Sequence, residues 1–170
     1  MEGVEPELPP KRRQPRPSAF NSTDNVFDDV NLALLRELQA DPRIATSELA
    51  RRIGMSAPAV RERIQRLEAA GVIAGYRVVI DPASVGLPIT AFARIRPLPG
   101  ALPKIAELAA ETPEVTECYR ITGEDCFLIK LHAPALDQLE RILDRFLAFG
   151  NTTTSIVVST TVAARQPPLP

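Results

Sequence analysis

Arginine is the residue type whose spacing points most clearly to chemistry in this sequence of 170 residues. Six arginines lie between positions 51 and 77, against Glu62 and Glu68, so this stretch carries a net charge of +4. From Asp81 onward there are eight basic and ten acidic residues, a net charge of −2, while the whole chain carries −1. A guanidinium group can bind phosphate or guanine through two parallel hydrogen bonds. The asymmetry therefore predicts a local nucleic-acid-binding surface in the N-terminal part.

Three short helices are predicted to position these arginines. Apolar residues at three- and four-residue spacing predict a helix over 28–41 and a second from 46 or 47 to 54. A third begins after Ser56 as N-cap, has Pro58 in its first turn and ends near Ala70. Two short helices joined by a tight turn at 54–55 are typical of a helix-turn-helix, whose second helix enters the major groove of DNA.

The third helix has two different faces. Val60, Ile64 and Leu67 form an apolar stripe that packs on the other helices, and the opposite face is polar. The candidate DNA-binding residues are Ser47, Arg51, Arg52, Ser56, Ala57, Pro58, Arg61, Glu62, Arg63, Gln65 and Arg66. We expect the start of the third helix to contact bases, and Arg51, Arg52, Arg63 and Arg66 to contact phosphates or brace the domain. The alternative is a solvated amphipathic helix of a small bundle.

The rest of the chain predicts an α+β fold. A short β-hairpin, or wing, is expected over 72–80 with its turn at 74–75, followed by a hinge at 81–88. Strands are predicted over 89–96, 115–122, 125–133 and 152–162, and helices over 102–111 and 136–149. This βαββαβ order is that of a ferredoxin-like fold. The predicted domains are an N-terminal (winged) helix-turn-helix domain at 24–80 and a ferredoxin-like domain at 89–163, with a tail at 164–170.

The first 23 residues predict a disordered, proline-rich, basic arm. They hold five prolines, with Lys11, Arg12, Arg13 and Arg16. Such an arm is either an inert solubilising tail or an auxiliary contact to DNA phosphates.

Composition excludes several other classes of protein. Two cysteines and one histidine are too few for a disulfide scaffold or a structural zinc site. No phosphate-binding glycine loop or nucleophile motif is present, so we expect no catalytic residues, no metal and no cofactor. The uncharged run at 146–164 is rich in Thr and β-branched residues, which is typical of a strand rather than a membrane helix. We expect a cytoplasmic protein with no membrane partner.

Several segments resemble the Lrp/AsnC (leucine-responsive/asparagine regulator) family. In the N-terminal part they are 47–50, 53–56, 60–68 and 71–73, and in the second part 117–128 and 152–157. The resemblance covers about 28 to 162. It implies a bacterial feast-or-famine transcriptional regulator that is not an enzyme and binds double-stranded DNA. It also implies a homodimer formed through the second domain, assembly into tetramers or octamers, and a small amino acid bound between dimers.

The matching positions carry over a set of effector-binding residues. Tyr119, Thr122, Gly123, Glu124, Asp125 and Cys126 are expected to form one wall of the amino-acid site. Thr152 and Thr154 are expected near the other wall. Backbone N–H groups of the glycine turn suit a carboxylate, and Glu124 or Asp125 suits an ammonium group. The alternative to this amino-acid effector is an architectural DNA-binding protein that responds to no ligand.

One segment departs from the family pattern. Leu147, Ala148 and Phe149 stand where the family usually has Pro-Gly-Val. Ala148 adopts a glycine-only backbone conformation at a cost, and Phe149 is bulkier than Val. If this corner lines the pocket, a different effector, or loss of the site, is expected.

Overall fold

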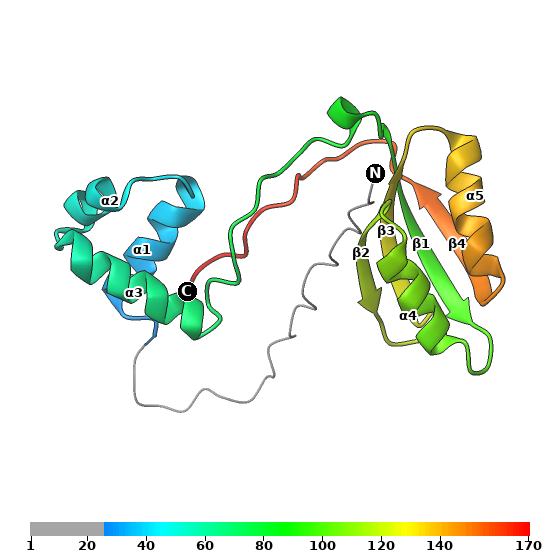
Figure 1. The fold of residues 1–170 in the computed structure, drawn as a ribbon, viewed down its shortest axis with the longest axis horizontal. Helices are drawn as coiled ribbons and strands as arrows, with labels where there is room; N and C mark the ends of the chain where they lie inside the picture. The colour runs from blue at the N-terminus through cyan, green and yellow to red at the C-terminus, as the bar shows by residue number, and fades with distance from the viewer. Residues whose placement is uncertain (1–25) are drawn as a thin grey trace, which may run out of the picture. The chain divides into compact units, whose positions relative to one another are not determined.

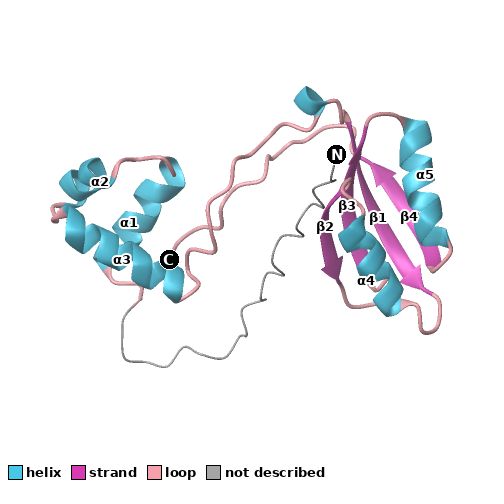
Figure 2. Cartoon of the chain, in the orientation of Figure 1, coloured by secondary structure: helices cyan, strands magenta, loops and turns pink. Residues whose placement is uncertain are grey.

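The computed structural model describes residues 26–170 (Figures 1 and 2). The predicted arm at 1–23, with both of its interpretations, lies outside the described residues. The described chain forms two compact units. We call residues 26–77 with Arg165–Pro170 the helical unit, and Val78–Ala164 the sheet unit.

The helical unit contains the three predicted helices, α1 (Asp29–Ala40), α2 (Thr46–Ile53) and α3 (Ala57–Ala69). Asp28 caps α1, because its side chain accepts a hydrogen bond from the backbone N–H of Asn31. Ser56 caps α3 in the same way, through the N–H of Ala59. The sequence prediction of these helices is confirmed.

The core of the helical unit is small and lies between the three helices. Leu34 of α1, Leu49 and Ala50 of α2, and Val60 of α3 are its buried members. Ile64 is half-buried against them. The apolar stripe predicted for α3 therefore does pack on α1 and α2.

The β-hairpin predicted over 72–80 is wrong. No strand forms anywhere in 70–88, and the regular element there is a short 3-10 helix, η1 (Ala83–Val85). Val78 and Val79 are 85% and 84% exposed. An isolated two-stranded hairpin is marginal in water without a surface to pack on, and no element of the described chain covers these side chains.

The sheet unit confirms the ferredoxin-like prediction. Its elements are β1 (Ile89–Pro97), α4 (Leu102–Glu111), β2 (Val115–Arg120), β3 (Phe127–Ala133), α5 (Leu136–Leu147) and β4 (Gly150–Ile156). The strand order is β2-β3-β1-β4, and every neighbouring pair is antiparallel. β2 and β4 are therefore the two edges of the sheet.

Three of the predicted strands extended too far. β2 ends at Arg120 rather than at 122. β3 begins at Phe127 rather than at 125, because residues 121–126 form a turn closed by the hydrogen bond from Ile121 N–H to the Cys126 carbonyl. β4 ends at Ile156 although β-branched residues continue beyond it. Val157 N–H donates to the Thr90 carbonyl at 2.8 Å, one residue from the start of β1, so later residues have no strand to pair with.

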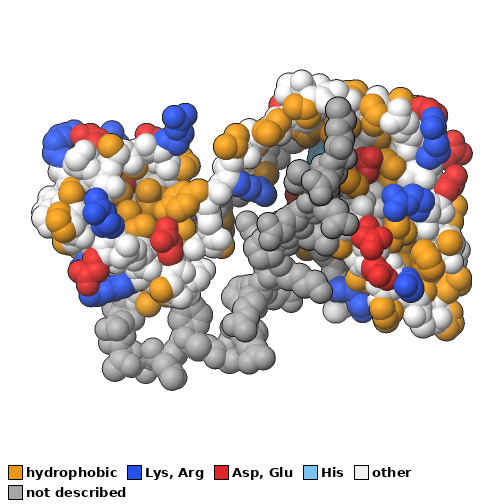
Figure 3. Space-filling model, in the orientation of Figure 1, with side chains coloured by type: hydrophobic (Ala, Val, Ile, Leu, Met, Phe, Trp, Pro, Cys, Tyr) orange, Lys and Arg blue, Asp and Glu red, His pale blue; other side chains and the backbone are white. Residues whose placement is uncertain are grey.

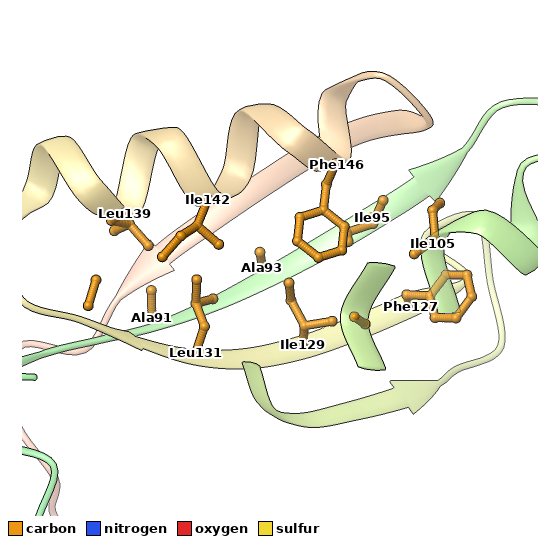
Figure 4. Packing of buried hydrophobic residues seen from close by; sticks show 12 residues of the cluster. Ala91, Ala93, Ile95, Ile105, Phe127, Ile129, Leu131, Leu139, Ile142 and Phe146 are labelled. Carbon is orange, nitrogen blue, oxygen red and sulfur yellow. The ribbon is translucent and has the colours of Figure 1, made fainter. Parts of the chain in front are cut away.

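The two faces of the sheet differ. One face packs against α4 and α5, and Figure 4 shows Leu139, Ile142 and Phe146 of α5 pointing toward it. The opposite, helix-free face carries the alternate residues of the central strands, which are Phe92, Arg94, Arg96, Leu128, Lys130 and His132. His132 is only 7% exposed and its Nδ1 lies 3.0 Å from Thr90 Oγ1. Burial lowers the pKa of its imidazole, so His132 is a neutral structural residue.

The corner between α5 and β4 shows which residue has to be glycine. Ala148 is in the ordinary right-handed helical region, so it needs no glycine conformation. Phe149 packs against the core of the sheet unit. At Gly150, by contrast, a Cβ would lie 2.5 Å from the Arg96 carbonyl oxygen and 3.1 Å from the Ile95 side chain. The departure from Pro-Gly-Val therefore leaves the backbone of this corner unstrained.

We predict that Gly150→Ala lowers the free energy of unfolding by about 1–3 kcal/mol, because the added methyl group forces β1 and β4 apart. Urea unfolding of the variant against Asn151→Ala, an exposed neighbour on the same strand, measures this. Equal unfolding midpoints for the two variants would show that the close approach is not a constraint.

Candidate DNA-binding and effector sites

The turn between α2 and α3 has the geometry of a helix-turn-helix. Gly54 ends α2 with φ of +73°, a left-handed conformation that favours glycine. The N–H of Met55 then bonds back to the Ala50 carbonyl at 2.9 Å, and Ser56 begins the next helix. The chain thus reverses in very few residues and holds α3 rigidly against α2.

Most candidate DNA-binding residues lie on the exposed side of α2 and α3. Those with exposed side chains are Ser47, Arg51, Arg52, Ser56, Pro58, Arg61, Glu62, Gln65 and Arg66. Ala57 differs, because it packs against the core of the helical unit. Arg63 differs as well, since its side chain turns toward α1.

Carboxylates within the helical unit hold several of the arginines. Arg51 and Arg52 both bind Glu48, at 2.7 and 2.9 Å, and Arg52 also reaches Glu37 of α1 at 2.7 Å. The hydrogen bonds from Arg51 and then from Arg52 lower the pKa of the Glu48 carboxyl to about 2. These three residues of α2 therefore form one exposed charge network that also ties α2 to α1.

Arg63 braces α3 against the start of α1. Its Nη1 donates to Asp28 Oδ2 at 2.6 Å and to Asn31 Oδ1 at 3.0 Å. The hydrogen bond from Arg63, with that from the Asn31 N–H, lowers the pKa of the Asp28 carboxyl. Of the two roles expected for Arg63, the geometry favours bracing over phosphate contact.

Arg61 stands apart from these residues. Arg66 pairs with Glu62 one turn away on α3, but no carboxylate among the described residues lies within ion-pair distance of Arg61. Its side chain is exposed near the start of the recognition helix. Arg61 is therefore the arginine of α3 that has its donors available.

The helical unit is less basic than the charge count from position 51 indicates. Between 26 and 77 there are eight arginines and seven carboxylates, a net charge of +1. On the face drawn in Figure 3, acidic side chains lie beside basic ones rather than leaving a continuous basic patch. Sequence reasoning missed the pairing on α2, although the three- and four-residue spacing of Glu48 from Arg51 and Arg52 was a signal for it.

The first wall of the predicted effector site lies at the β2 edge. The Tyr119 hydroxyl on the helix-free face donates to Glu117 Oε2 at 2.6 Å, and Lys130 binds the other Glu117 oxygen at 3.2 Å. Thr122, Gly123, Glu124, Asp125 and Cys126 form the turn that follows β2. Gly123 has φ of +105°, and Cys126 Sγ lies 3.9 Å from its carbonyl oxygen.

Two arginines that sequence reasoning did not select face this turn. Asp125 lies 3.7 Å from both Arg94 Nε and Arg96 Nε, and Glu124 is paired with Arg96. Both arginines come from β1, where the alternation of outward residues was visible in the sequence. The turn therefore presents cations as well as the carboxylates expected for an ammonium group.

The second predicted wall lies elsewhere in the sheet. Thr152 and Thr154 pair with Ile95 and Ala93, so their side chains are on the helix-covered face at the β4 edge. Tyr119 on β2 is three strand spacings, about 14 Å, from β4. Asp125 lies closer, because it meets Arg94 and Arg96 of β1, but these arginines are on the helix-free face. Within one chain, the threonines and Asp125 are therefore on opposite faces of the sheet.

Residues 26–170 contain neither a metal site nor a helix that could span a membrane. No group of three or more His, Cys, Asp or Glu side chains is placed to hold a metal ion. None of the described helices has the length and apolar character needed to cross a membrane.

Comparison with known proteins agrees with this architecture. Residues 27–68 match the AsnC-type helix-turn-helix domain, and residues 90–167 match the Lrp/AsnC ligand binding domain. The HTH-type transcriptional regulator LrpA of Mycobacterium tuberculosis is 37% identical over 146 residues, which is 84% of this chain and 97% of that protein. The chain belongs to the Lrp/AsnC family of DNA-binding transcriptional regulators, and these are not enzymes.

Solved structures show the same fold. The structure of LrpC from Bacillus subtilis is 28% identical with a TM-score of 0.76, and the match covers 81% of this chain and 98% of that one. A feast or famine regulatory protein from Mycobacterium tuberculosis, complexed with L-methionine, is 35% identical with a TM-score of 0.73. That match covers 82% of this chain and 97% of the other.

We predict that Glu48→Gln flattens the acid dependence of stability. The folded chain holds the Glu48 pKa at about 2 instead of 4.5, so its stabilising contribution is complete above pH 4.5 and is lost as pH falls toward 2. Urea unfolding midpoints of both proteins across this pH range measure the effect. The difference between them should shrink in high salt, which screens exposed ion pairs; parallel pH profiles would contradict the network.

Proposed function

We propose that this protein binds a specific double-stranded DNA site as a homo-oligomer, and that a bound amino acid modulates its DNA affinity or assembly. The observation that carries the DNA part is the α2–turn–α3 unit with Arg61 exposed and without an ion-pair partner among residues 26–170. As its bacterial relatives are DNA-binding regulators, we further propose that it acts in the cytoplasm, where the DNA lies.

The DNA contacts follow from the distribution of charge partners. Arg61 contacts base edges, together with Ser56, Pro58, Glu62 and Gln65 along the exposed side of α3. Arg51, Arg52 and Arg66 are exposed and contact phosphates by exchanging a carboxylate for a phosphate oxygen. Two such helices in a dimer would meet successive major grooves about 34 Å apart.

The amino-acid effector is supported by both the comparisons and the chemistry of the turn. The ligand binding domain matches at 90–167, and the 35% identical relative from Mycobacterium tuberculosis is complexed with L-methionine. An amino acid needs a partner for its carboxylate and another for its ammonium group. The turn offers backbone N–H groups and Arg96 for the first, and Asp125 or Glu124 for the second.

The separation of the two predicted walls supports an oligomer. Because Asp125 meets β1 on the helix-free face and the threonines of β4 lie on the helix-covered face, we propose that the threonines complete the site from a second copy of the chain. The helix-free face is suited to a dimer contact, since it has no covering element within the sheet unit and includes Phe92 and Leu128. We propose dimers that associate further into tetramers or octamers.

Fluorescence anisotropy of labelled DNA from the region upstream of the gene, at fixed salt, tests this function. The label belongs on the DNA because the chain has no Trp. Binding that resists competitor DNA and shifts with one amino acid is the expected result. Binding that no amino acid alters would favour an architectural DNA-binding protein instead.

Arg61→Ala should weaken binding to the specific site by about tenfold or more while changing random-sequence binding much less, because a base contact carries about 1–3 kcal/mol of discrimination. Arg66→Ala is the matched control on the same exposed face and should weaken both kinds of binding similarly. Equal losses on both DNAs for Arg61→Ala would mean that Arg61 contacts only phosphate.

Asp125→Asn should abolish the shift caused by the amino acid and leave basal DNA binding intact, because it removes the charge that meets the ammonium group. Asp137→Asn on α5, whose carboxylate is also paired with an arginine, is the control and should respond normally. A normal response in Asp125→Asn would remove this residue from the effector site.

A further inference from the structure

The segment Arg165–Pro170 belongs to the helical unit although it follows the sheet unit in sequence. Two side chains of α1 donate hydrogen bonds to its backbone. Arg36 Nη2 bonds to the Pro170 carbonyl and Gln39 Nε2 bonds to the Pro167 carbonyl, each at 3.3 Å. The segment therefore crosses α1 in the direction opposite to the helix.

The spacing of the two donors on α1 matches the spacing of the two acceptors on the C-terminal segment. Arg36 and Gln39 are three residues apart, so they project from one side of α1. A Pro-Pro-Leu-Pro sequence favours the polyproline II conformation, which has three residues per turn. The carbonyls of Pro167 and Pro170 then also project to one side. Proline has no N–H to donate, so the segment cannot form a complete strand ladder, and here its two carbonyls accept from side-chain donors.

The partial burial of Leu169 and the available guanidinium group of Arg36 agree with this contact. From 161 to 170 every residue is exposed except Leu169, which is partly buried. Among the described residues, no carboxylate pairs with Arg36, so its guanidinium is available to the Pro170 carbonyl. Leu169 thus places an apolar side chain between the two bonded prolines.

We propose that the outer side of α1 is a docking surface for the C-terminal segment 165–170 of its own chain. This gives the helical unit a second connection to the sheet unit. Residues 78–88 lead into β1 and residues 157–164 lead out of β4. The Val157 N–H bonds to the Thr90 carbonyl, so the two connections start side by side at one end of the sheet. The chain that leaves β4 thereby ends on α1.

Cysteine cross-linking in the full-length protein tests this docking. In a Cys118→Ser, Cys126→Ser background, Ala40→Cys, an exposed residue next to Gln39, and Gln166→Cys are joined with a short bismaleimide. Both donors of α1 are kept, and the linked peptides are identified by mass spectrometry. We expect an efficient link within one chain. Adding Arg36→Ala should reduce its yield about threefold to tenfold, the loss expected for one hydrogen bond. Arg51→Cys with Gln166→Cys is the control pair, because Arg51 is exposed on α2 and paired with Glu48.

The outcomes separate the possible occupants of this surface. Mixing isotopically light and heavy chains shows whether a link joins one chain or two. In an equal mixture that has exchanged subunits, light–heavy links as frequent as the light–light and heavy–heavy links together would mean that the segment of a second copy occupies α1, which overturns docking in the same chain. A yield no higher than that of the control pair, in variants with unchanged melting curves, would overturn the docking altogether.

Discussion

The order of the strands in the sheet unit constrains everything that the protein can do with a ligand. β3 and β1 occupy the centre and bury their alternate residues under α4 and α5, so they fix the core. The same pairing places Asp125 against Arg94 and Arg96 on the helix-free face, whereas Thr152 and Thr154 of β4 lie on the helix-covered face. One amino acid cannot contact both faces of a sheet, because the strands lie between them. We therefore propose that the effector site takes its threonines from a second chain, which would couple ligand binding to assembly in one equilibrium.

Ion pairs within the helical unit decide which arginines are left for DNA. Glu48 and Glu37 hold the α2 arginines, and Asp28 turns Arg63 inward. A single exposed pair of this kind adds little stability, but the pairs orient the side chains before DNA arrives. Arg61 differs from them, because no carboxylate in the described part of the chain is paired with it. Contact at Arg61 thus costs the least reorganisation, which suits a residue that distinguishes one sequence from another.

Local sequence signals predicted most of the fold. Gly54 and Ser56 marked the turn and the cap of the recognition helix, and hydrophobic periodicity marked the sheet and its two helices. The hairpin failed because its strand propensity had no surface to pack on, and only the tertiary structure shows that Val78 is exposed. The candidate site was predicted less well. The bond between Asp28 and Arg63 spans 35 residues, and the sequence could not show that Thr152 and Asp125 lie on opposite faces of the sheet.

Subunit complementation tests the shared site most directly. Asp125→Asn alone should bind DNA without responding to the amino acid, and so should a chain carrying Thr152→Val and Thr154→Val. These two variants are then mixed and allowed to exchange subunits. Some of the sites formed combine Asp125 of one chain with Thr152 and Thr154 of the other, and we expect part of the wild-type response to return. If verified mixed oligomers stay unresponsive, the two walls do not build one site between chains, and the account is contradicted.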